Sequence, residues 1–181
     1  MRKLIIGIVI GIFAIASYAS TLSPYQGEQQ RRIKALSSKV IEAYLAGKGM
    51  GFAKAAELNH YPGPRHVLDL AEQLAMSAEQ ENKTQALFDS MQAKAKTLGE
   101  RLVEQERTLD QMFASGKVDN QNLKQQLLHI GELRARLRYV HLQAHLTQKS
   151  LLTKHQIIQY DQLRGYSANG AKHTGSVDHH H

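Results

Sequence analysis

The 181-residue sequence contains no cysteine, no tryptophan and only three prolines. The absence of cysteine excludes a disulfide framework, a thiol nucleophile and any metal site built from thiolates. With so few prolines, long stretches of the chain can form uninterrupted helix. The two longest patterned runs also lack the alternation at every second residue that a half-buried β-strand requires. These absences favour an all-α protein of about one domain.

Two long amphipathic runs fill the chain between Ala78 and about Gln148 and are joined by a short segment, residues 116–120. Their apolar residues recur in steps of three and four, as on one side of an α-helix. Gly116 can end the first helix with a positive φ, and Asp119 can cap the second. We therefore expect a long antiparallel helical hairpin. Its expected apolar positions are Leu87, Met91, Ala95, Leu98, Leu102, Leu109, Met112 and Phe113, then Leu123, Leu127, Ile130, Leu133, Leu137, Val140 and Ala144.

Shorter helices are expected on both sides of the hairpin. An amphipathic pattern predicts a helix from Gln29 to Ala46, and further short helices are expected at residues 51–58 and from His66 to Met76. Two prolines and a glycine at residues 62–64 exclude helix at that point. The last helix is expected to follow Thr153 and to end near Gly165. Residues 20–166 are expected to form this single helical domain.

The two ends of the chain differ from the middle. Residues 1–19 combine Arg2 and Lys3 with an apolar stretch and small residues at Ser17 and Ala19, which is typical of a cleaved secretory signal peptide. An uncleaved anchor is the alternative, but the apolar run is short for a bilayer span. Residues 167–181 are expected to be a disordered tail, and its final histidines are compatible with an expression tag. The expected location is the periplasm.

The formal net charge of +7 is compatible with several kinds of partner: nucleic acid, anionic lipid, and acidic or unfolded polypeptide. Export to the periplasm argues against nucleic acid. The sequence also lacks a Ser-His-Asp arrangement, a phosphate-binding loop and a paired-carboxylate signature, so we do not expect an enzyme.

Two capping boxes stand at the two ends of the hairpin. Ser77 is followed three residues later by Gln80, and Thr153 is followed three residues later by Gln156. In such a box the hydroxyl accepts a backbone hydrogen bond and the glutamine returns one, which fixes a sharp start to the helix. An apolar residue precedes each box, Met76 in the first and Leu152 in the second. The two boxes form a weak internal repeat.

Together with the order of the elements, these motifs resemble the paired LTxxQ motifs of the Spy/CpxP family of periplasmic stress proteins. Leu152, Thr153 and Gln156 match the motif, whereas Met76 and Ser77 depart from it conservatively. The resemblance implies an intertwined, cradle-like homodimer. It also implies an ATP-independent chaperone for unfolded or damaged envelope proteins, with no cofactor required, or alternatively a periplasmic heavy-metal sensor or resistance protein. Inhibition of a sensor kinase's periplasmic domain is a third possibility.

Capture of unfolded clients would need apolar surface and positive charge. The basic residues proposed for client binding are Arg31 and Arg32 in the first helix and Arg134 and Arg138 in the hairpin, with Lys94 and Lys96 as further candidates. Arg134 and Arg138 are four residues apart and share a helical face, which Arg136 does not. The alternative is that these cations belong to solvated faces and pair with nearby glutamates.

His141 and His145 form the sharpest candidate metal site, because a spacing of four places both imidazoles on one helical face. In the metal-sensing relatives a His-x-x-x-Met pair supplies ligands. His141 matches its first position and His145 replaces the methionine, which favours zinc or nickel, with copper as a further candidate. His60 and His66, on either side of the proline corner, are the other proposed ligands. The alternative is that His141 and His145 border the apolar stripe as interface side chains.

Overall fold

The computed structural model describes residues 22–167. The predicted signal peptide and all but the first residue of the predicted tail lie outside the described residues. Within the described part the chain is all-helical and has no strand, as expected from the sequence. No described helix is long and apolar enough to cross a membrane. The elements are η1 (Glu28–Gln30), α1 (Ser38–Leu45), α2 (Lys54–Glu57), α3 (Pro64–Asp69), α4 (Ala78–Ala114), α5 (Asn120–Leu151) and α6 (Lys154–Leu163).

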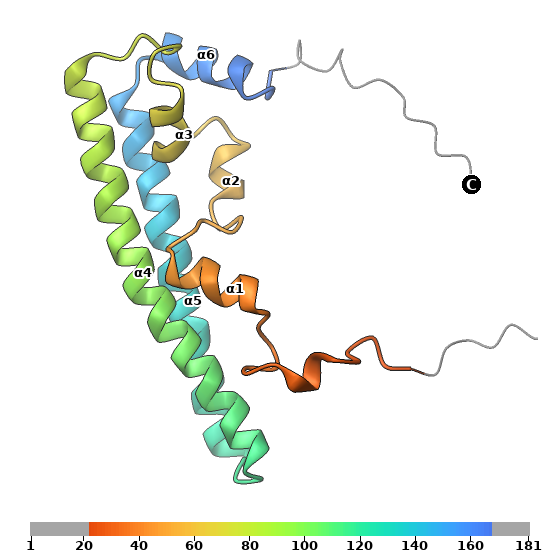
Figure 1. Cartoon of the computed structure of the whole chain (residues 1–181). Helices are drawn as coiled ribbons and strands as arrows, with labels where there is room; N and C mark the ends of the chain where they lie inside the picture. Colours follow the sequence, from red (N-terminus) through yellow and green to blue (C-terminus); the bar gives the residue numbers. More distant parts are fainter. Residues whose placement is uncertain (1–21, 168–181) are drawn as a thin grey trace, which may run out of the picture.

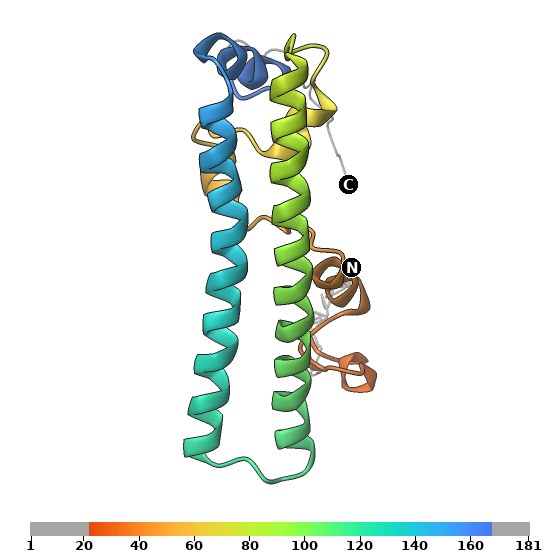
Figure 2. The same cartoon turned by 90° about the vertical axis from the view of Figure 1, so that its left-hand side faces the viewer.

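The fold is built on the α4–α5 hairpin, in which the two long helices run antiparallel and side by side (Figures 1 and 2). α4 has 37 residues and α5 has 32, so the arms are roughly 55 and 48 Å long at 1.5 Å per residue. Gly116 adopts a φ of 66° just after α4. The Asp119 carboxylate accepts from the backbone N–H groups of Gln121 and Asn122 at the start of α5. Both expected helix ends are therefore confirmed.

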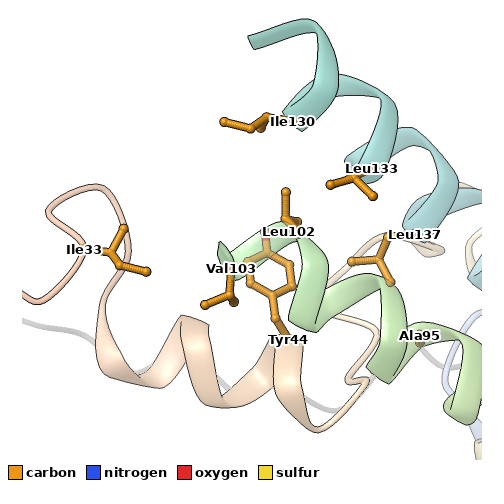
Figure 3. Packing of buried hydrophobic residues seen from close by; sticks show 8 residues of the cluster. All are labelled: Ile33, Tyr44, Ala95, Leu102, Val103, Ile130, Leu133 and Leu137. Atoms are coloured by element: carbon orange, nitrogen blue, oxygen red, sulfur yellow. The ribbon is translucent and has the colours of Figure 1, made fainter. Parts of the chain in front are cut away.

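The main core lies where α1 crosses the hairpin (Figure 3). Gly99 of α4 allows this crossing, because a Cβ built on it would lie 2.2 Å from the backbone oxygen of Tyr44. A second cluster closes the other end of the hairpin beneath α6. The buried members of the main cluster are Ile33, Tyr44, Ala95, Leu102, Val103, Ile130, Leu133 and Leu137.

Three expectations about the flanking and apolar segments were wrong. The helix expected from Gln29 to Ala46 is only α1, because the chain before Ser37 is a short 3₁₀ turn and irregular backbone, and the Ser37 hydroxyl caps the helix by accepting from Val40. The helix expected from His66 to Met76 instead begins at Pro64, within the corner where helix was excluded, because proline fits the first position of a helix, and it ends at Asp69, where turns follow. Phe113 and Leu127 are exposed, at 58% and 50%. They lie near the turn that joins α4 to α5, beyond the part of the hairpin that α1 covers.

The shorter helices are all on one side of the hairpin. In Figure 1, α1, α2, α3 and α6 lie to the right of α4 and α5, and no other described element lies to the left. Figure 2 looks directly at this uncovered side, which we call the open face. On the open face, the hairpin presents its own side chains without a covering layer.

Candidate functional site

A groove runs along the open face between α4 and α5. Its larger part has a volume of about 510 Å³, and a smaller part of about 210 Å³ continues it and shares Lys94 and Val140. Apolar side chains from both helices line the groove, including Leu98, Met91 and Tyr139. Tyr139 is 59% exposed. The groove therefore offers unburied apolar surface to another molecule.

The charged residues of the groove are both cations, Lys94 and Arg136. Arg136 pairs with Glu132 one turn away at 2.5 Å, whereas Lys94 has no ion pair among the residues that the structure describes. Lys94 and Lys96 are two residues apart, so they leave α4 on opposite sides. Lys96 packs against Gly47, just after α1. Only Lys94 of the two lysines is placed to meet a molecule on the open face.

The four arginines proposed for client binding do not line this groove. Arg31 pairs with Glu28 at 2.7 Å, and Arg32 is exposed in the same N-terminal segment. Arg134 and Arg138 are exposed on α5. Burial raises the pKa of Glu106 on α4, and the Arg134 guanidinium partly offsets that rise. The structure thus places the groove's positive charge at Lys94 and Arg136 instead.

Both predicted capping boxes are present. Ser77 accepts from the backbone of Gln80 and Thr153 accepts from the backbone of Gln156, and each glutamine side chain accepts from the backbone N–H of its cap. Leu152 is buried in the cluster beneath α6. The boxes fix the two corners at which the chain enters and leaves the hairpin.

His141 and His145 are both buried on one face of α5, as their spacing predicted. The His141 ring stacks on Phe52 with 6.0 Å between centroids, and its Nε2 atom has no hydrogen-bond partner. Burial, with a smaller contribution from His145, lowers the pKa of His141. His145 Nδ1 lies 2.7 Å from the backbone oxygen of Tyr61, to which it can donate. Both rings thus hold the segment around α2 against α5.

The structure does not bring the four proposed metal ligands together. His60 Nδ1 contacts Asp161 Oδ2 of α6 at 2.7 Å. His66 and His145 line a pocket of about 380 Å³ together with Glu57. Burial and the nearby Arg164 lower the pKa of His66. Among the described residues, no group of three or more His, Cys, Asp or Glu side chains is arranged to hold a metal ion.

Glu57 is the centre of a polar cluster that sequence reasoning missed. Its Oε1 atom accepts from the hydroxyls of Tyr160 at 2.5 Å and Tyr166 at 3.1 Å, and Arg164 lies 3.5 Å away. Burial, with the Glu57 carboxylate, raises the pKa of Tyr160 well above its usual range. The one sequence signal was that Glu57 is the only acidic residue between Glu42 and Asp69. The cluster ties α2 to α6 across the top of the hairpin.

Comparison with known proteins adds no relative: no family model, curated protein or solved structure matches this chain.

Proposed function

We propose that this protein is a periplasmic, ATP-independent chaperone of the Spy/CpxP kind that holds unfolded or damaged envelope proteins. The observation that supports the proposal is the open-face groove. It offers apolar side chains, Leu98, Tyr139 and Val140, beside cations at Lys94 and Arg136. An unfolded chain exposes apolar residues that a folded protein buries, and each one sequestered from water gains about 1.5–3 kcal/mol before ordering costs.

The cations supply the second property that a holdase needs. Arg101 is seven residues after Lys94 and so lies on the same side of α4. Positive charge at Lys94, Arg101 and Arg136 would attract acidic clients over long range, and salt would weaken that attraction. Release would need no nucleotide, because each contact is weak and reversible.

The proposed assembly is a homodimer. Exposed apolar side chains follow the edge of α5 that faces away from α4: Leu128 and Leu146, eighteen residues and so about five helical turns apart, are 65% and 58% exposed. Figure 2 shows this edge at the left of the hairpin. A second copy laid along it would remove these side chains from water. We propose that the α5 edge joins two copies and leaves the groove for clients.

An aggregation assay tests the chaperone proposal. The mature protein, at near-stoichiometric amounts, should suppress light scattering by a chemically denatured client diluted into buffer. Ala93→Glu places a carboxylate in the groove and should reduce suppression several-fold. Ala86→Glu is the matched control, because Ala86 is also exposed on α4 but does not line the groove. No suppression at large excess, or equal loss in both variants, would reject the proposed function.

Metal sensing is the second candidate. The observation that favours it is that His66, His145 and the Glu57 carboxylate line one pocket, although they would have to move closer to share an ion. Calorimetric titration of tag-free protein with zinc, nickel and copper tests this candidate. Binding that is lost in His145→Ala and kept in His129→Ala, an exposed position on the same helix, would support it. Unchanged binding in His145→Ala would remove this pocket as the metal site.

A further inference from the structure

The chain before α1, residues 22–37, lies against α4 as an N-terminal strap. Its structure is limited to the three-residue 3₁₀ helix η1 and short turns, in one of which the Leu36 amide donates to the Ile33 oxygen at 3.0 Å. Tyr25 near its start is 71% exposed. The strap therefore depends on α4 for its position, because it has little regular structure of its own.

One apolar side chain anchors the strap. Ile33 is 1% exposed and belongs to the main core. Figure 3 shows it pointing from the strap toward Val103 of α4. Leu36 packs against the same cluster from the other end of the turn. A short segment that buries one isoleucine in another element's surface resembles a bound peptide more than a core helix.

The next residue supplies the polar half of the contact. Asp110 of α4 accepts from the Lys34 backbone N–H through Oδ1 and from Lys34 Nζ through Oδ2, both at 3.1 Å. One carboxylate thus recognises a backbone N–H in a turn and a cation at once. Arg31 and Glu28 pair with each other inside the strap, so they add no ion pair to α4. The recognised unit is an apolar residue followed by lysine.

We propose that the α4 surface around Val103 and Asp110, here called the strap slot, is a docking site for short peptide segments in which an apolar residue precedes a lysine. The chain's own Ile33 and Lys34 occupy the slot as a built-in competitor. A partner that presents the same pair in a turn of this kind displaces the strap. This inference does not depend on the chaperone proposal, because neither Val103 nor Asp110 lines the open-face groove.

Peptide binding in trans tests the proposal. The probe is a fluorescein-labelled synthetic peptide of residues 28–37, and the full chain carries Ile33→Ser and Lys34→Ser to unseat its own strap. Fluorescence anisotropy should show at least tenfold tighter binding to this variant than to the unaltered chain. Adding Asp110→Asn should weaken binding at least fivefold, whereas Asp89→Asn, an exposed aspartate elsewhere on α4, should leave it unchanged. Equal binding to both chains, or no effect of Asp110→Asn, would overturn the proposal.

A second measurement does not require the double serine variant to fold. Lys34→Glu alone should speed amide hydrogen exchange of residues 33–36 about tenfold, because two carboxylates then face each other. Adding Asp110→Lys to that variant should restore the slow exchange by reversing the pair. If exchange stays slow in Lys34→Glu, or if the reversed pair does not restore protection, the carboxylate does not hold the strap and the slot lacks the proposed specificity.

Discussion

The side chains of Gln80 and Gln156 bond to each other: the Gln80 amide donates to the Gln156 oxygen at 2.9 Å, and the Gln156 amide donates back at 3.1 Å. Each amide also donates to a backbone oxygen, Gln80 to Leu151 and Gln156 to Leu74. The two capping boxes are therefore one joint. The corner where α4 begins and the corner where α6 begins are fixed against each other at the end of the hairpin opposite its turn.

Gln156→Ala should lower the free energy of unfolding by about 1–3 kcal/mol, because it leaves buried polar partners unsatisfied and removes half of a capping box. Chemical denaturation followed by circular dichroism measures the change. Gln162→Ala, on an exposed position of α6, is the control and should change stability by less than about 0.5 kcal/mol. A double-mutant cycle with Gln80→Ala should give a coupling of about 0.5 kcal/mol or more. Additive effects would show that the two glutamines act separately.

Gly99→Ala should destabilise the protein by about 1–3 kcal/mol, because its new methyl group would press against the backbone of Tyr44 and force α1 away from α4. Gly131→Ala is a matched control in the other long helix, where a Cβ meets nothing within 4 Å. That substitution should stabilise by up to about 1 kcal/mol, since alanine favours helix over glycine. Thermal unfolding of both variants tests the contrast, and similar shifts of Tm would contradict it.

Stability should fall as the pH is lowered below about 6.5, the usual pKa of histidine. Burial and His145 lower the pKa of His141 in the folded state. The unfolded chain therefore binds the proton more readily, so the neutral ring's stabilisation is complete above pH 6.5 and is lost toward the folded-state pKa. His141→Phe keeps a ring against Phe52 and cannot titrate. Denaturation at pH 7.5 and 5 should show a smaller loss in this variant than in the unaltered protein. His129→Gln, at an exposed histidine of α5, should show the unaltered loss.

Tyr160→Phe should cost about 1–3 kcal/mol of stability, because it removes a buried donor from the Glu57 carboxylate. Tyr166→Phe removes the weaker donor, whose side chain is only half-buried, so water can replace it and the loss should be smaller. Urea unfolding compares the two variants. A larger loss for Tyr166→Phe would mean that Tyr166, rather than Tyr160, holds α2 to the end of the hairpin.

The sequence alone predicted the hairpin, the turn from Gly116 to Asp119 that joins its two helices, and both glutamine capping boxes. A capping box is made by two residues three positions apart, so both partners can be recognised in the sequence without knowledge of the tertiary structure. The same local argument placed His141 and His145 on one face. It failed for the helix expected from Gln29, because a helical pattern of apolar residues also suits an irregular strap that buries only Ile33.

Only the tertiary structure decided which side of the hairpin is covered, and with it where the candidate sites lie. Which cations border the groove, and that Glu57 meets Tyr160 from 103 residues away, depend on how α2 and α6 fold back over the hairpin. These contacts depend on burial and on hydrogen bonds between segments far apart in the chain. The spacing of residues within one helix gives no information about the free energies of such interactions. The short-range pattern of the chain determined where its long helices begin and end, and long-range packing determined which segments they contact.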